Sequence, residues 1–138
     1  MEDMKNILII LMCAVLFSGC SNRTKTVPEN ISNGKGSYTK ISQDEAKQMM
    51  ENDDGHVIVD VRREDEYVTG HIPGAILIPN ESIGMEKPAE LPDLDQIILV
   101  YCRSGNRSAQ ASQKLAELGY TRIYDFGGIM TWTGEIEK

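Results

Sequence analysis

Three short runs of apolar, mostly β-branched residues constrain the fold of this chain more than any other sequence feature. They are Val57–Val61, Ala75–Ile78 and Gln96–Tyr101. Each run is too short for an ordinary helix, and successive positions are apolar rather than alternate ones. This pattern is typical of strands that are covered on both faces, which occur mainly in parallel sheets.

Helical patterns lie between and around these runs. Ser42 and Glu45 have the spacing of a capping box, and apolar residues follow at positions 46, 49 and 50. A short helix is predicted over residues 64–69, and a longer amphipathic one over residues 107–118, ended by Gly119. A final strand is predicted over residues 121–124. Alternating strands and helices predict an α/β domain, assigned here to residues 38–138.

Composition excludes several functions. The 138 residues carry 21 acidic and 14 basic side chains, so a nucleic-acid backbone is not an expected partner. The three cysteines, at positions 13, 20 and 102, have no paired spacing, so neither a disulfide scaffold nor a four-ligand zinc site is predicted. We expect no metal and no cofactor.

The N-terminal segment has the pattern of a targeting signal. Ile7–Phe17 is an uncharged run too short to span a bilayer, and Ser18-Gly19-Cys20 follows it. The segment resembles a bacterial lipoprotein signal, which implies cleavage of residues 1–19 and lipid, including palmitate, on Cys20. The alternatives are an uncleaved signal anchor and an ordinary secreted protein. A start at Met4 would restore the basic flank that such signals have.

The residues after that signal set the expected location. Residues 20–37 are rich in Ser, Asn, Thr, Lys and Gly, and they are predicted to be a flexible tether behind the lipidated Cys20. The lipoprotein resemblance implies a protein anchored by lipid on the extracytoplasmic side of a membrane in a bacterial cell envelope.

The predicted chemical site is the turn between the third run and the long helix. Ligands of parallel sheets bind at the carboxyl ends of strands, where Cys102 lies. The amides of residues 103–107 can curl around its sulfur at a helix N-terminus, with Gly105 permitting the turn. Arg103 and Arg107 add positive charge, and the short polar residues Ser104, Asn106 and Ser108 suit turns and caps. Thiols in such surroundings ionise readily, so Cys102 is the predicted nucleophile; the alternative is a small apolar residue that ends a core strand.

Three motifs together resemble the single-domain rhodaneses, sulfurtransferases that carry sulfur as a cysteine persulfide. The motifs are Val59-Asp60-Val61-Arg62 with Glu66-Tyr67 and Gly70–Ala75, then Tyr101–Ser108, and last Gly127–Trp132. The resemblance implies a mainly parallel five-stranded sheet with helices on both faces. This sequence departs from the family pattern at Ser82–Leu91. The family commonly has a helix there, whereas Gly84 and Pro88 disfavour a regular helix in this chain.

The length of the cysteine loop separates two chemistries on this fold. A related phosphatase and arsenate-reductase branch has five residues between Cys and Arg, whereas four separate Cys102 from Arg107. The tighter loop suits the outer sulfur of a persulfide. We therefore expect sulfur transfer from thiosulfate or a similar donor to a thiol, cyanide or protein acceptor. The alternatives are a membrane-tethered persulfide carrier with little turnover and, less favoured, a phosphatase or arsenate reductase.

The sequence also predicts how single side chains contribute. Arg103 is expected to contact the donor's oxyanion, and the resemblance implies that Arg107 braces the loop through its carbonyls. Asp60 and Arg62 are expected to pair as supports, with contact between Arg62 and substrate as the alternative. Because Cys13 leaves with the signal and Cys20 carries lipid, the sulfur acceptor must be another molecule.

Other polar and aromatic residues receive structural interpretations. His71 is expected to order a turn rather than act as a base, and His56 to lie at the surface. Residues 64–66, all acidic, are expected to form a solvated helix face. Trp132 is expected to anchor the core rather than wall a pocket.

Overall fold

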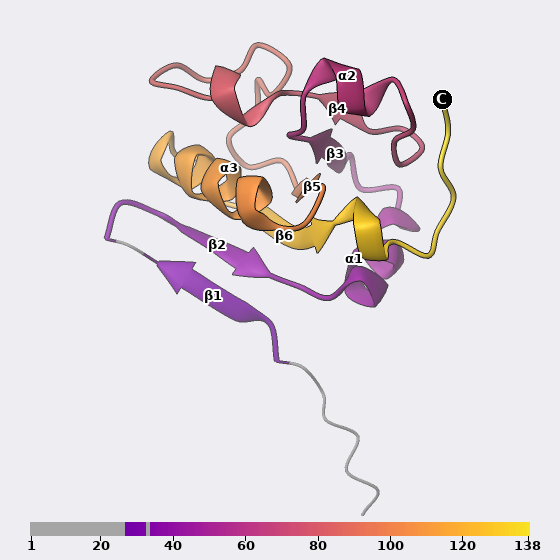
Figure 1. The fold of residues 1–138 in the computed structure, drawn as a ribbon. Helices are drawn as coiled ribbons and strands as arrows, with labels where there is room; N and C mark the ends of the chain where they lie inside the picture. The colour runs from indigo at the N-terminus through magenta and orange to yellow at the C-terminus, as the bar shows by residue number, and fades with distance from the viewer. Residues whose placement is uncertain (1–26, 33) are drawn as a thin grey trace, which may run out of the picture.

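A computed structural model describes residues 27–32 and 34–138 and contains one six-stranded sheet with the order β1-β2-β6-β5-β3-β4. Strand β1 is antiparallel to β2, and every other neighbouring pair is parallel. Figure 1 shows β1 and β2 together as a ribbon at one edge of the molecule. The strands are β1 (Glu29–Ser32), β2 (Ser37–Lys40), β3 (Val57–Asp60), β4 (Ile76–Leu77), β5 (Ile98–Cys102) and β6 (Ile123–Gly128).

Helices cover both faces of the sheet, as the sequence predicts. Helix α3 (Asn106–Glu117) packs on one face through Ala111 and Leu115, and helix α1 (Gln43–Met50) packs on the other through Ala46. The predicted capping box starts α1, because Ser42 Oγ accepts the amide of Glu45 and the Glu45 carboxylate accepts the amide of Ser42. The remaining helical turns are α2 (Glu64–Tyr67) and the 3₁₀ turns η1 (Asn80–Ser82) and η2 (Ile129–Thr131).

The central strand β5 is buried along its whole length, which explains its uninterrupted apolar run. Its alternate side chains enter two different cores. Val100 and Cys102 join the cluster under α3, whereas Leu99 and Tyr101 join the cluster under α1. The thiol of Cys102 therefore faces the α3 side of the sheet.

Residue patterning predicts four strands and the family resemblance implies five, whereas the sheet has six, with β1 and β2 outside the patterned runs. Strand β1 and the first residue of β2 lie in the range 20–37 predicted to be a flexible tether, so that prediction is wrong for residues 29–32 and 37. Strand β1 pairs backbone to backbone with β2, and only Ile31 of its side chains packs against the core. An edge strand held by its ladder needs no apolar pattern, so composition does not reveal it.

The other predicted elements form with small shifts. The last strand is longer than predicted and reaches Gly128, and no α-helix forms within Ser82–Leu91 after η1. The predicted signal, residues 1–19, and Cys20 lie outside the described residues. In the described part of the chain, no helix is both long and apolar enough to cross a membrane.

Candidate functional site

Cys102 lies at the carboxyl end of β5 with 1% of its surface exposed. The amide of Gly105 donates to its Sγ at 3.0 Å, and α3 begins at the next residue, Asn106. Gly105 has a φ of 106°, which a residue with a side chain adopts only under strain. Among the backbone amides of residues 103–107, all of which the structure describes, the Gly105 amide is the one that donates a hydrogen bond to Cys102 Sγ.

The other loop residues surround this bond. Arg103, Ser104 and Asn106 are exposed at the rim. Ser108 is fully buried in the first turn of α3, where its hydroxyl donates to the carbonyl of Gly105 at 3.0 Å. The buried hydroxyl of Ser108 thus connects the loop to helix α3, while the side chains at the tip of the loop are exposed to solvent.

The end of β6 and the turn that follows it pack against the backbone of the loop. The amide of Met130 donates to the carbonyl of Arg103 at 3.1 Å, and Gly128 lies opposite Cys102 in the sheet. A side chain at Gly128 would collide with the Arg103 carbonyl and approach Ser104 Cα to 2.7 Å. Gly128 of the third sequence motif therefore allows close backbone contact between β6 and the loop.

Arg107 binds a carboxylate of α2 rather than the loop carbonyls. Its Nη1 and Nη2 donate to Glu66 at 2.6 and 2.9 Å, a two-point contact. This hydrogen bonding lowers the pKa of Glu66 to about 2 and raises that of Arg107. Two predictions are therefore corrected: Arg107 braces α3 against α2, and Glu66 is not part of a solvated face. Local helix patterning could not reveal a partner 41 residues away.

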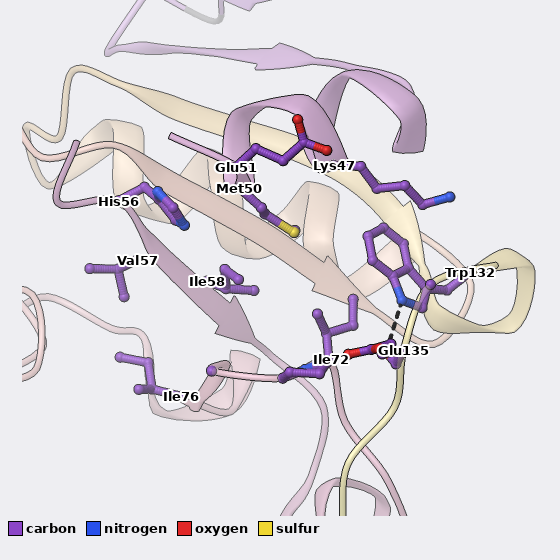
Figure 2. A pocket seen from close by; sticks show the side chains of 13 residues that line it. Lys47, Met50, Glu51, His56, Val57, Ile58, Ile72, Ile76, Trp132 and Glu135 are labelled. Atoms are coloured by element: carbon purple, nitrogen blue, oxygen red, sulfur yellow. Dashed lines mark hydrogen bonds between the residues drawn. The ribbon is translucent and has the colours of Figure 1, made fainter. Parts of the chain in front are cut away.

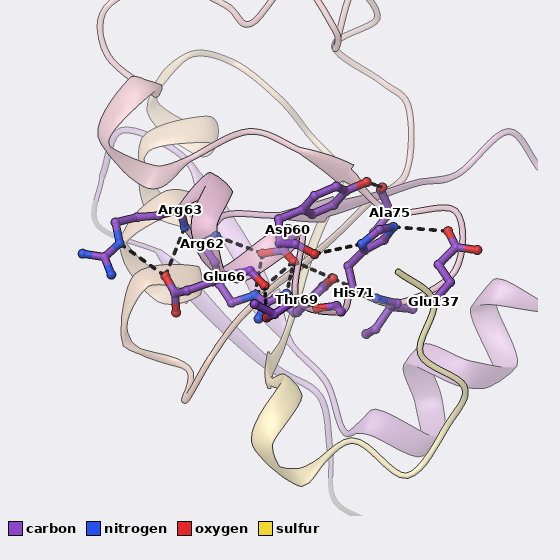
Figure 3. A network of polar contacts seen from close by, with 12 residues as sticks. Asp60, Arg62, Arg63, Glu66, Thr69, His71, Ala75 and Glu137 are labelled. Atoms are coloured by element: carbon purple, nitrogen blue, oxygen red, sulfur yellow. Dashed lines mark hydrogen bonds and ion pairs between the residues drawn. The ribbon is translucent and has the colours of Figure 1, made fainter.

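Asp60 and Arg62 pair as predicted, inside a buried network (Figure 3). Arg62 Nε and Nη2 donate to the Asp60 carboxylate at 2.7–3.0 Å, and Nη2 also donates to the carbonyl of Gly70 at 2.8 Å. Tyr101 donates its hydroxyl to Asp60 at 2.8 Å and accepts the amide of Ile72 at 3.1 Å. Burial and the Asp60 charge raise the pKa of Tyr101. With 5% of its surface exposed, Arg62 is placed as a support for the residue preceding Cys102.

His71 orders a turn, as expected. Its ring stacks on Tyr67 at 3.8 Å between centroids, and its Nε2 lies 3.3 Å from the Glu137 carboxylate (Figure 3). The backbones of His71 and Glu137 also pair, which fastens the C-terminal segment to this turn. His56 is less exposed than expected. The His56 Nδ1 lies 2.7 Å from the Asp54 carboxylate, and the His56 side chain lines a cavity.

That cavity, of about 680 Å³, lies on the α1 side of the sheet (Figure 2). Met50, Ile58, Ile72 and Trp132 contribute to its wall, and Cys102 does not. Trp132 packs on Phe126 with 5.6 Å between centroids, as expected of a core anchor, and it also lines this cavity, which is not the pocket of Cys102.

One buried polar residue near the loop was missed. Asp125 of β6 is 3% exposed and accepts the amide of Gly127 at 3.0 Å, and burial raises its pKa. The signal available in the sequence was an acidic residue between Tyr124 and Phe126, within the final strand. A smaller cavity of about 330 Å³ is lined by Asp125 and Lys40 together with the loop residues Ser104–Asn106. No cluster of three metal-binding side chains occurs among residues 27–32 and 34–138.

Comparisons with known proteins converge on one family. The model of the rhodanese-like domain matches residues 42–135. The chain is 35% identical over 111 residues to a putative sulfur carrier protein, YrkF, of Bacillus subtilis, covering 79% of this chain and 58% of that protein. It is 37% identical over 71 residues to the thiosulfate sulfurtransferase PspE of Escherichia coli, covering 51% of this chain and 68% of that protein.

A solved structure agrees with these sequence matches. A rhodanese with anions from Escherichia coli superposes with a TM-score of 0.56 and is 32% identical. The match covers 60% of this chain and 98% of that one. The residues matched by the family model, 42–135, include the Cys102 loop.

Proposed function

The chain belongs to the rhodanese-like domain family, and on that premise we propose that it transfers sulfane sulfur from thiosulfate or a similar donor through a persulfide on Cys102. The observation that carries the proposal is the hydrogen bond from the Gly105 amide to Cys102 Sγ at the N-terminus of α3. Amides and a helix dipole at that point stabilise negative charge on sulfur, both as thiolate and as persulfide.

The reaction proceeds in two half-reactions. The Cys102 thiolate attacks the outer sulfur of thiosulfate, the sulfur–sulfur bond of the donor breaks, and its electron pair leaves with sulfite. An acceptor thiolate or cyanide then attacks the outer sulfur of the persulfide, and the Cys102 thiolate is regenerated. Such covalent catalysis predicts ping-pong kinetics. Exposed Arg103, which follows the nucleophile, contacts the oxygens of the donor.

Loop length supports sulfur rather than an oxyanion as the group that the loop holds. Four residues separate Cys102 from Arg107, and the Gly105 amide is already within hydrogen-bond distance of sulfur. Arg107, which is held by Glu66, is engaged outside the loop. These features disfavour a tetrahedral phosphate or arsenate enclosed by the loop.

A second candidate function is that of a persulfide carrier that delivers sulfur to a protein. One observation favours it: the related Bacillus protein is named a putative sulfur carrier. Cys102 is also the one cysteine among the described residues. With Cys13 removed in the signal and Cys20 carrying lipid, as proposed below, the acceptor thiol belongs to another molecule.

We also propose that the domain is tethered to a membrane through lipid on Cys20. Because β1 begins at Glu29, eight residues separate Cys20 from the sheet rather than the longer tether predicted from composition. A random-coil chain of eight residues has an end-to-end distance of about 14–17 Å. Labelling with a palmitate analogue, compared with Cys20→Ala, tests this; an unlabelled protein would overturn it.

The decisive test of function is sulfite release from thiosulfate with cyanide as acceptor, measured for the purified protein and for Cys102→Ser. We expect turnover that Cys102→Ser abolishes. A mass gain of one sulfur without turnover would favour the carrier. Faster hydrolysis of phosphate esters or reduction of arsenate than transfer from thiosulfate would contradict the interpretation of the loop.

A further inference from the structure

Asp125 is a buried carboxylate next to the Cys102 loop, and the mechanism above does not use it. It lies on the α3 face of β6, opposite Val100 of β5 and Lys40 of β2. The charged or titratable groups that face it are Lys40 and Tyr38 of β2, while α3 contributes the hydroxyl of Ser108. Burying a charged carboxylate costs free energy unless the carboxylate is hydrogen-bonded, so any structural role of Asp125 rests on its hydrogen bonds.

The contacts of Asp125 indicate that it stabilises a β-bulge in β6. Val100 pairs with Asp125 but Cys102 pairs with Gly128, so β6 has one more residue than β5 across this step. The extra residue turns the backbone at Gly127, whose φ is 89°. The Asp125 carboxylate accepts the Gly127 amide at 3.0 Å, and so satisfies a group that the bulge removes from the ladder.

The bulge lies beside the loop at the residue that binds sulfur. A Cβ built on Gly105 would be in ordinary van der Waals contact with Gly127 Cα, at 3.7 Å, so Gly127 is the nearest neighbour of Gly105 on that side. Ser108 links them from the helix side, since its hydroxyl is 3.0 Å from the Gly105 carbonyl and 3.3 Å from that of Gly127. A shift of the bulge therefore displaces the Gly105 amide relative to Cys102 Sγ.

We propose that Asp125 is a positioning residue for Cys102: it fixes the β6 bulge, and the bulge holds the Gly105 amide against the sulfur. The inference rests on Cys102 as the reactive group of the proposed function. It does not depend on which donor or acceptor the protein uses, because thiol reactivity can be measured without either of them.

The test is the rate of Cys102 alkylation by iodoacetamide at pH 7, followed by mass spectrometry of the peptide that contains Cys102. Asp125→Asn keeps an oxygen that can accept the Gly127 amide, whereas Asp125→Leu has similar volume and the same charge as Asn but no acceptor. Comparing these two variants isolates the hydrogen bond from the charge. Asp93→Ala is the matched control, because Asp93 accepts the amide two residues ahead at 2.9 Å in an exposed turn before β5.

We expect Asp125→Asn and Asp93→Ala to react within about twofold of wild type, and Asp125→Leu to react about tenfold more slowly, the scale of one hydrogen bond to a charged group. Equal rates in Asp125→Asn and Asp125→Leu, with both folded, would overturn the proposal. Failure of wild type to release sulfite would contradict the proposed function and leave this comparison intact.

If Asp125→Leu does not fold, a measurement on wild type decides the question. Lowering the pH protonates Asp125, and the amide proton resonances of Gly127 and Gly105 should shift together with one midpoint. A Gly105 resonance that stays unchanged while Gly127 moves would overturn the proposal.

Discussion

The ion pair between Arg107 and Glu66 yields the sharpest quantitative prediction. Replacing Glu66 by Gln removes the charge but keeps the size of the side chain and its oxygen facing the Arg63 amide. The pKa of Glu66 falls from 4.5 to about 2 in the folded protein, chiefly through hydrogen bonding to Arg107. At 1.36 kcal/mol per pKa unit this corresponds to at most about 3 kcal/mol of stability at pH 7.

The expected loss is smaller than that limit. About a fifth of the Glu66 side chain and a quarter of the Arg107 side chain are exposed, so solvent screens the pair. We therefore expect Glu66→Gln to lower the free energy of unfolding by about 1–2 kcal/mol at pH 7. Because the folded-state pKa is lowered, this stabilisation is complete above the unfolded value of 4.5 and is lost as the pH falls towards 2.

Urea denaturation at pH 7 and pH 3 measures both the size and the pH dependence. Glu64→Gln is the matched control, since Glu64 is an exposed acid on the same helical turn. The difference between the two variants should be more than halved at pH 3. Equal stabilities at pH 7, or a deficit of Glu66→Gln that does not shrink at pH 3, would refute the reasoning.

Three further predictions concern the surroundings of Cys102. Gly128→Ala should lower stability by about 1–3 kcal/mol and slow sulfite release, because its methyl group collides with the loop backbone; Gly84→Ala, with open space around it, should change neither quantity, and equal behaviour of the two would contradict the packing. Tyr101→Phe should cost about 1–3 kcal/mol in thermal unfolding, since it leaves the buried Ile72 amide without its acceptor; an unchanged melting temperature would refute this. Asp125→Asn should melt higher than wild type at pH 7, because a raised carboxyl pKa means that ionisation opposes folding. That advantage should fade as the pH falls through the raised pKa of folded Asp125 and should be gone below the unfolded value near 3.8, and a pH-independent difference would argue against it.

Much of the fold is predictable because its causes are local. The capping box of α1 needs only Ser42 and Glu45, and the buried strands carry apolar residues at successive positions because helices cover both faces. Strand β1 lacks such a signal, since its exposed side chains are not selected by burial. The pair Asp60 and Arg62 is similarly local, because the two residues are two positions apart at a strand end.

The sequence alone predicts the candidate nucleophile, and it places that residue in its loop. Cys102, the glycine at 105 and the start of the helix are contiguous, so residue type and spacing suffice to predict a sulfur held at a helix N-terminus. Only the tertiary structure decided what holds that loop in place. Glu66 reaches Arg107 across 41 residues, and Asp125 acts through a bulge in a strand that follows α3. The physical reason is that the partners of a buried charge are chosen by chain packing, and packing between distant segments leaves no periodic pattern in the sequence.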